Sequence, residues 1–322
     1  MSTLLVRHLT VLVIFILVVV GMVAGIEVTH RQEAIQDESI STGDNLLSDP
    51  VVDEKIVEVT EDFIQPAKPV TTTPVIVGDS RVKAQAYLIA DIETGEVYDS
   101  RNMDKAYPVA SMSKLVTALV TLDTIASTTQ ITISEADTRV ASDTSMLRAG
   151  EMFSRDELLK ALLLSSSNVA AMALASTTGN RDAFMEHMSA LSWEIGMPKT
   201  FFADPSGLSS SNVASARDIF ALARYLQLYR PEILSLTTIP QYEIATTTDH
   251  GAHQVISTHP FVADTRFVGG KTGRTPEAGE TMLTILKIND RTIAFVVLKS
   301  LYGYRALDTK YLIENYIQKF SN

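Results

Sequence analysis

Apolar residues recur three and four positions apart in the stretch that follows Pro108, as at Leu115 and Leu119. This spacing places them on one face of an α-helix and predicts that the helix is buried. A proline directly ahead of such a run is typical of a helix start. We therefore predict a buried helix that begins near Ser111.

Two further buried helices are predicted on either side of a polar cluster, Ser-Ser-Ser-Asn at residues 165–168. Residues 154–157 have the pattern of a capping box and predict a helix over residues 156–164. The apolar run 169–175 predicts the second helix. Four consecutive hydrogen-bonding side chains between buried helices are costly unless they bond one another or face a wet cleft. We expect one of these two arrangements at the cluster.

Two more helices are predicted toward the C-terminus. Residues 215–218 carry a capping signal for a helix over residues 219–228, and residues 305–320 form an amphipathic pattern. We expect the latter helix to pack on a sheet, because its polar face lacks the many lysines and arginines of a membrane-surface helix. The string Ser-Ser-Ser-Asn-Val-Ala recurs at residues 209–214, where its surroundings predict a surface loop.

Extended segments predict two antiparallel hairpins. Residues 84–91 pair with residues 96–99 across a turn that contains glycine, and residues 280–286 pair with residues 292–298. The second hairpin is apolar along both strands, so both of its faces should be buried. A short extended piece is expected at residues 130–134.

Residues 1–26 are predicted to form a transmembrane signal-anchor. Residues 9–26 are 18 in number and apolar apart from Thr10, with Arg7 just ahead of them. A cleaved signal peptide usually has a shorter apolar core and a small-x-small cleavage site, which residues 23–25 match poorly. We therefore expect a single-pass membrane protein with the rest of the chain outside the cytoplasm. A long, cleaved signal peptide, and hence a secreted protein, is the alternative.

Residues 27–80 are predicted to be a flexible stalk that leads to a folded domain at residues 81–322. Between Glu27 and Pro66 eleven acidic and two basic residues account for −9 of the net charge of −11, and a Pro/Thr-rich stretch follows. The remainder is nearly neutral, which gives no indication of nucleic-acid binding. The chain has no cysteine, so disulfides, thiol catalysis and cysteine-bound metals are excluded.

Ser111 and Lys114 are the strongest candidates for chemistry. Residues three apart on a helix share a face, so the lysine amine can reach the serine hydroxyl. A desolvated lysine can remove the proton from a serine and activate it as a nucleophile without a histidine. The alternative is a helix cap with an exposed lysine. The pattern Ser-x-x-Lys also occurs at Ser80, where a solvated turn is expected.

A second candidate element is the Gly-Gly-Lys-Thr-Gly-Arg sequence at residues 269–274. Glycines at a strand edge let a ligand approach the backbone closely. Lys271 and Thr272 offer a cation and a hydroxyl to a carboxylate. The sequence lacks the spacing of a Walker phosphate-binding loop, so a nucleotide site is not indicated.

Three motifs stand in order along the chain: Ser-x-x-Lys at Ser111, Ser-x-Asn at Ser166 and Lys-Thr-Gly at Lys271. They resemble the three motifs of the penicillin-recognising serine transpeptidase superfamily. Within it the chain is similar to the D-alanyl-D-alanine carboxypeptidases, the low-molecular-mass penicillin-binding proteins, from about Ala84 to the C-terminus. Other matching segments are residues 91–97, 147–150, 204–208, 215–218 and 271–279.

The sequence also departs from the family pattern. Ser167 stands in the second motif where many relatives have glycine, and Arg274 stands where histidine is frequent. The C-terminal β-domain and amphipathic anchor of many relatives are not found after Lys271, so the N-terminal segment is expected to supply the anchor.

The resemblance implies an α+β fold with layered α/β architecture: a β-lactamase/transpeptidase-like antiparallel sheet flanked by helices, plus a mostly helical subdomain. It implies that Ser111 attacks the carbonyl between two terminal D-alanines of a peptidoglycan stem peptide and that Lys114 accepts its proton. Ser166 and Asn168 would relay the proton and hold the substrate. Lys271 and Thr272 would bind the terminal carboxylate, and Gly273 and Arg274 would complete the substrate-binding residues. The backbone N–H groups of Ser111 and Arg274 would form the oxyanion hole.

Penicillins and other β-lactams would, by the same resemblance, acylate the enzyme as covalent inhibitors, and no cofactor is implied. The alternatives are a D-alanyl-D-alanine endopeptidase, a β-lactamase, and an inactive wall-binding homologue. A class A β-lactamase would resemble Ser-Asp-Asn in the second motif and carry a Glu-x-x-Leu-Asn loop, and neither is present. His250 and His253 have metal-ligand spacing, but their surroundings favour a loop and no metal is expected.

Overall fold

The computed structural model describes residues 81–143 and 145–320. The predicted anchor and the whole of the predicted stalk, which ends with Ser80, lie outside them. None of the helices within the described residues combines the length and the apolar character that a membrane span requires.

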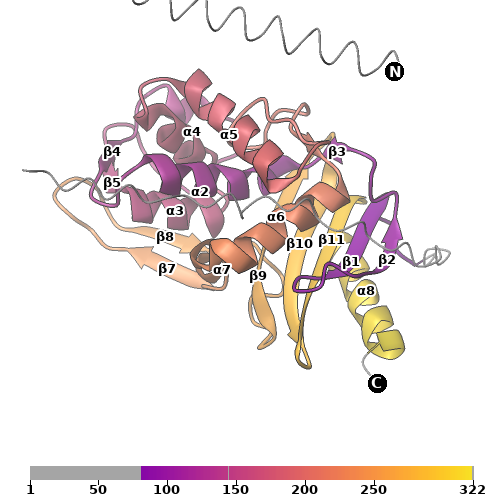
Figure 1. Ribbon diagram of the computed structural model, residues 1–322. Helices are drawn as coiled ribbons and strands as arrows, with labels where there is room; N and C mark the ends of the chain where they lie inside the picture. The colour runs from indigo at the N-terminus through magenta and orange to yellow at the C-terminus, as the bar shows by residue number, and fades with distance from the viewer. Residues whose placement is uncertain (1–80, 144, 321–322) are drawn as a thin grey trace, which may run out of the picture. The chain divides into compact units, whose positions relative to one another are not determined.

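A five-stranded antiparallel sheet, in the order β2-β1-β11-β10-β9, forms one layer (Figure 1). Both predicted hairpins are confirmed as β1 with β2 and β10 with β11. Because the two terminal hairpins pair through β1 and β11, the last strands of the chain lie between the first strand and β9. The strands are β1 Ala86–Asp91, β2 Val97–Arg101, β9 Phe267–Thr275, β10 Gly279–Ile288 and β11 Arg291–Ser300.

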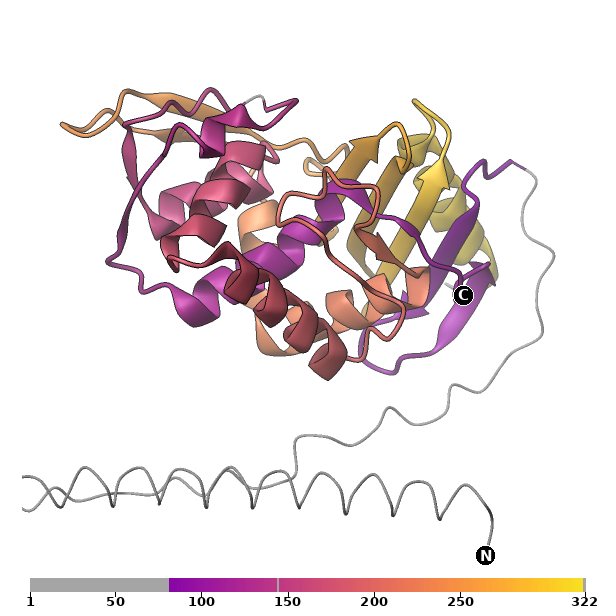
Figure 2. The same ribbon diagram turned by 90° about the horizontal axis from the view of Figure 1, so that it is seen from above.

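The sheet separates two apolar clusters because alternate residues of each strand point to opposite faces. Leu88 belongs to the main core, whereas its neighbour Ile89 packs with Leu312 and Tyr316 of α8 (Arg305–Phe320) on the other face. Figure 2 shows α8, in yellow, and α6 (Ala216–Tyr229), in orange, on opposite sides of the strands. The prediction that residues 305–320 form a helix packed on a sheet is therefore confirmed.

The remaining helices form a mainly helical subdomain beside the sheet (Figure 1). Local signals fix where some of its helices begin. One is the capping box at the start of α3, in which the side chains of Ser154 and Glu157 bond each other's backbone. Its helices are α2 Ser113–Thr124, α3 Arg155–Leu163, α4 Asn168–Thr177, α5 Arg181–Ile195 and α7 Pro231–Thr237. No helix was predicted at α5 or α7.

Short strands and two 3₁₀ turns complete the described chain. Three two-stranded ladders join β3 to β6, β4 to β5 and β7 to β8. These elements are β3 Tyr107–Pro108, β4 Gln130–Thr132, β5 Met152–Ser154, β6 Val213–Ala214, β7 Gln241–Ile244, β8 His253–Ile256, and the turns η2 Ala110–Met112 and η3 Asp137–Arg139. The extended piece expected at residues 130–134 is thus confirmed as β4.

The segment 209–214 differs from its prediction as a surface loop. Its first residues are accessible, but Asn212 is fully buried and the segment ends in the strand β6. The Asn212 side chain accepts from the backbone of Ala203 and Asp204 and donates to Ser113 Oγ, 3.0 Å away. Local polarity misleads here because the partners of Asn212 come from other parts of the chain.

Candidate active site

Ser111 lies in the 3₁₀ turn η2, directly ahead of α2, and Lys114 lies in the first turn of that helix. The helix was predicted to begin near Ser111, and the structure places its first α-helical residue two positions later. Ala110 has a left-handed φ of 51° in the 3₁₀ turn, a conformation that is strained for a residue other than glycine. This turn places Ser111 Oγ 2.9 Å from Lys114 Nζ.

Lys114 is fully buried and contacts three oxygen atoms. Besides Ser111 Oγ, its Nζ bonds Asn168 Oδ1 at 2.7 Å and the main-chain oxygen of Ser206. The latter two are carbonyl oxygens and can only accept hydrogen bonds. A neutral amine has two N–H groups to give them, which directs its lone pair at the Ser111 hydroxyl. In its neutral form Lys114 is therefore oriented to accept the proton of Ser111.

Burial lowers the pKa of Lys114 from its ordinary value of 10.5 to about 7, against the opposing charges of Asp204 and Asp143. The alternative prediction of an exposed lysine beside a helix cap is thus wrong, because no part of Lys114 is accessible to solvent. A pKa near 7 leaves a large fraction of the amine neutral at neutral pH, as a general base requires.

Ser166 lies in the turn between α3 and α4, where the interruption of two helices was predicted, and Asn168 is the first residue of α4. Ser166 has a left-handed φ of 62°, a strained conformation for a residue other than glycine. Its hydroxyl accepts from Lys271 Nζ at 2.8 Å, and Asn168 bonds Lys114. The polar cluster thus links both buried lysines.

Lys271 and Thr272 lie in β9, at the edge of the sheet that faces the helical subdomain. Burial lowers the pKa of Lys271 well below 10.5, and repulsion from Lys114 and Arg305 lowers it further. Thr272 Oγ1 is 2.8 Å from Thr258 Oγ1. Without substrate, the site therefore disfavours the protonated form of Lys271. A bound carboxylate would favour that form again.

Two glycines allow the chain to pass close to Ser111. A Cβ added at Gly273 would lie 2.8 Å from the Val109 carbonyl oxygen and 2.9 Å from Ser111 N. At Gly207, where φ is +84°, it would lie 2.1 Å from the Ala110 carbonyl oxygen. Only residues without a side chain fit at these contacts. The Gly in Lys-Thr-Gly thus places β9 directly against the backbone of Ser111.

Arg274, the last of the predicted binding residues, is exposed beyond this contact. Its guanidinium lies over the ring of Tyr302, 5.2 Å from the centroid, and donates to the Tyr302 hydroxyl at 3.2 Å. The oxyanion hole assigned to the backbone N–H groups of Ser111 and Arg274 stays a prediction, as do the roles of all eight site residues.

His250 lies in the loop between β7 and β8, as expected, whereas His253 lies in a strand. Both are buried, His253 begins β8, and the ring of His250 stacks on Phe153 with centroids 4.3 Å apart. His253 Nε2 is 2.9 Å from a carboxylate oxygen of Glu151. Across residues 81–143 and 145–320, no group of three or more His, Cys, Asp or Glu side chains could hold a metal ion.

Several residues that support the site were not singled out as site residues from the sequence. Asp204 receives the backbone N–H groups of Ser206, Gly207 and Ser209, which shapes the loop that brings the Ser206 carbonyl to Lys114. The Asp-Pro-Ser-Gly stretch carried a turn signal for this loop. Its contact with Lys114 joins residues 92 positions apart and could not be read from local sequence.

Comparison with known proteins supports one family. A family model described as D-alanyl-D-alanine carboxypeptidase matches residues 71–301. A D-alanyl-D-alanine endopeptidase of Pseudomonas aeruginosa is 33% identical over 67% of this chain and 71% of its own length. A D-alanyl-D-alanine carboxypeptidase of Mycobacterium tuberculosis is 28% identical over 68% of this chain and 75% of its own length.

Among solved structures, penicillin-binding protein D2 of Listeria monocytogenes in its cefotaxime-bound form is similar with a TM-score of 0.65. It is 26% identical, and the match covers 74% of this chain and 98% of that protein. This similarity, with the antiparallel sheet and its flanking helices, confirms the predicted fold class for the described residues.

Proposed function

The chain belongs to the family of D-alanyl-D-alanine carboxypeptidases, and from this premise we propose that it cleaves the bond between two terminal D-alanines through an acyl-enzyme on Ser111. The substrate is the peptidoglycan stem peptide. The observation that carries the proposal is the environment of Lys114, which is fully buried and, among the described residues, has Ser111 as its only hydroxyl partner. This geometry supports Lys114 as the general base.

In the proposed reaction Ser111 Oγ attacks the carbonyl carbon while its proton passes to Lys114 Nζ. The C–N bond then breaks, and the leaving amine of D-alanine takes up a proton through Lys114 or Ser166. Water hydrolyses the resulting ester and restores the Ser111 hydroxyl. β-Lactams would acylate the same oxygen, as expected for a chain similar to a penicillin-binding protein solved with cefotaxime.

Lys271 and Thr272 would bind the terminal carboxylate of the substrate. The pKa of Lys271 is lowered by burial and by neighbouring cations, so an anion placed beside it favours its charged form. A substrate with an uncharged end offers no such compensation. The site is thus suited to a peptide that ends in a free D-alanine.

We predict that kcat/KM falls about 10- to 150-fold when the terminal carboxylate of a D-alanyl-D-alanine peptide is replaced by an amide. This range corresponds to about 1.5–3 kcal/mol for a charge-assisted hydrogen bond. Release of the C-terminal residue from the acid and the amide gives the ratio by chromatography. In Lys271→Ala most of this ratio should disappear.

The ratio between the two substrates is the informative quantity, because Lys271→Ala also changes the field at Lys114. Equal cleavage of acid and amide by the wild type would contradict carboxylate recognition. That result would favour the second candidate, an endopeptidase that cuts D-alanyl cross-links with the same residues. The more identical of the two relatives reported above, at 33%, is a D-alanyl-D-alanine endopeptidase, which keeps this candidate open.

We also propose that residues 1–26 anchor the protein in the cell membrane and that residues 27–80 hold residues 81–322 away from it outside the cytoplasm. The proposal rests on the apolar run at 9–26. Sequencing of the N-terminus of protein from the membrane fraction should find an uncleaved segment. A mature terminus near residue 26, with the protein in the medium, would instead mean a secreted enzyme.

A further inference from the structure

The turn that carries Ser166 and Asn168 is held by a carboxylate from another part of the chain. Asp143 Oδ1 accepts from Ser167 Oγ at 2.9 Å, from Val169 N at 3.1 Å and from Asn168 N. These backbone groups are the first two N–H groups of α4, which have no partners inside the helix. Ser167 Oγ accepts from the third, on Ala170, at 3.0 Å. Asp143 and Ser167 together therefore satisfy the start of α4.

The second oxygen of Asp143 organises its own loop. Asp143 Oδ2 accepts from Ser145 N at 3.0 Å and from Ser145 Oγ, which in turn lies 2.8 Å from Ser167 Oγ. In the opposite direction, Asn168 Nδ2 donates to the carbonyl oxygens of Ala141 at 3.0 Å and Ser142 at 3.4 Å. The loop and the turn thus hold each other through bonds in both directions.

This network holds Ser166 and Asn168 in place beside the two buried lysines. Ser166 is kept in a strained left-handed conformation, which persists only where surrounding contacts impose it. Ser166 Oγ contacts Lys271, and Asn168 Oδ1 contacts Lys114. A shift of the turn would therefore move one partner of each buried lysine at once.

We propose that Asp143 is a positioning residue for acylation: it fixes the Ser166–Asn168 turn and, through Asn168, the orientation of the Lys114 amine toward Ser111. The inference rests on the proposed acyl-enzyme mechanism and adds a residue that none of the three motifs contains. Asp143 does not touch the nucleophile, so its effect on the geometry of the site passes through Asn168.

Asp143 also acts on Lys114 through its negative charge, in addition to its hydrogen bonds. Lys114 is influenced by the negative charges of Asp204 and Asp143, and the pKa of Lys271 shows that the two buried lysines repel each other. Removing the charge of Asp143 should favour the neutral amine of Lys114. Because only the neutral amine can accept the Ser111 proton, the acylation rate should rise with pH as Lys114 loses its charge and then reach a plateau. In a variant without the Asp143 charge, this rise, the acid limb of the pH profile, would lie at lower pH, even though the plateau rate falls.

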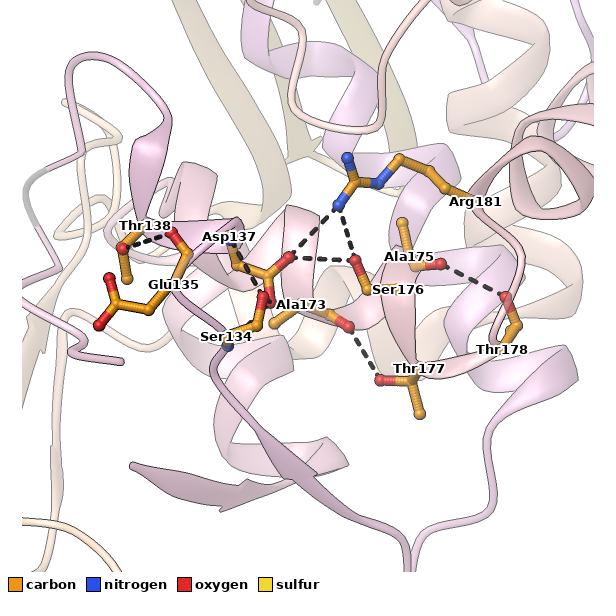
Figure 3. Close-up of polar contacts among 10 residues, drawn as sticks. All are labelled: Ser134, Glu135, Asp137, Thr138, Ala173, Ala175, Ser176, Thr177, Thr178 and Arg181. Atoms are coloured by element: carbon orange, nitrogen blue, oxygen red, sulfur yellow. Dashed lines mark hydrogen bonds and ion pairs between the residues drawn. The ribbon is translucent and has the colours of Figure 1, made fainter. Parts of the chain in front are cut away.

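A matched control exists on the same helix. Asp137 accepts from Ser176 Oγ at 3.0 Å and pairs with Arg181 at 3.3 Å, at the C-terminal end of α4 (Figure 3). Like Asp143, it holds a loop to α4 through a serine hydroxyl and backbone bonds, since Ser134 N also donates to it at 3.0 Å. The two aspartates contact opposite ends of this helix, at Asn168 and at Ser176, which lie about 12 Å apart along its axis.

The test measures the second-order rate of acylation by a fluorescent penicillin between pH 5 and 9 in Asp143→Asn, Asp143→Glu and Asp137→Asn. Asp143→Asn should lower the plateau rate about 10- to 100-fold, because small displacements of catalytic groups have effects of that size. Its acid limb should move down by roughly half a pH unit or more. Asp143→Glu keeps the charge but displaces the oxygens, so it should lower the plateau with little change in the acid limb.

Asp137→Asn should lower the melting temperature while leaving both the plateau and the acid limb at their wild-type values. The inference is overturned if Asp143→Asn acylates like the wild type, or if Asp137→Asn reproduces its changes. If Asp143→Asn does not melt cooperatively, the plateau of Asp143→Glu against that of Asp137→Asn decides the matter. A wild type that is not acylated at all would instead contradict the proposed function.

Discussion

Ser111→Ala is expected to abolish covalent labelling by a fluorescent penicillin and to lower peptide cleavage by at least about 1,000-fold. Loss of the nucleophile in serine hydrolases has effects of this order or larger. The hydroxyl of Ser111 lies 2.9 Å from the buried Lys114 amine. Gel fluorescence after incubation with the label and chromatography of the peptide products measure the two effects.

Ser80→Ala is the matched control, because Ser80 begins the other Ser-x-x-Lys sequence of the chain. This variant should label like the wild type. The label on the wild type should persist for minutes or longer, because the sequence lacks the Glu-x-x-Leu-Asn loop of class A β-lactamases. Labelling that survives in Ser111→Ala would contradict the assignment of the nucleophile, and rapid loss of the label would favour a β-lactamase.

Elements whose signals are contained in a few consecutive residues could be predicted from the sequence. The capping boxes at Ser154 and Ser215 each bond a carboxylate three residues later, and both mark the helix starts seen in the structure. The missed helix α5 also carried such signals: Asn180 caps its start, and Gly196, with φ of 90°, caps its end. The sequence therefore contains local signals for α5 at both of its ends.

Contacts between distant segments could not be predicted in the same way. The pair of Ser111 and Lys114 is local, so its geometry follows from helical spacing. The contact of Lys271 with Ser166 joins residues 105 positions apart, and only the resemblance to a known family put them in one site. Asp143 belongs to no motif, and its bonds to α4 depend on how the loop folds onto the helix.

The second large effect is expected from the titration of Lys114. Burial lowers its pKa to about 7, and only the neutral amine can accept the Ser111 proton. The acylation rate should therefore rise with pH through about 7 and level off above it. Two pH units below that value about 1% of the amine is neutral, so the rate at pH 5 should be about 100-fold below the plateau.

The low pKa of Lys114 lowers the stability of the fold, and the pH dependence of this loss shows that unfolding does not cause the fall of the acylation rate at low pH. Relative to an exposed lysine, keeping Lys114 neutral at pH 7 costs about 4–5 kcal/mol, since each pKa unit corresponds to about 1.4 kcal/mol. A folded-state pKa below the unfolded value destabilises the fold below pH 10.5, increasingly so down to about pH 7 and by a constant amount below it. Protonation of Lys114 should thus change the stability of the fold little below pH 7. A loss of rate in that range is therefore due to protonation of the base and not to unfolding.

Lys114→Ala separates the base from the rest of the site. It should lower acylation about 100- to 10,000-fold, the usual contribution of a general base, and remove the acid limb centred near pH 7. Asp137→Asn, remote from Lys114, should keep that limb unchanged. A wild-type acylation rate that stays flat from pH 5 to pH 9, with the protein folded throughout by circular dichroism, would contradict Lys114 as the base. The proton of Ser111 would then have to pass to another group, and Lys271, which bonds Ser166, would become the next candidate.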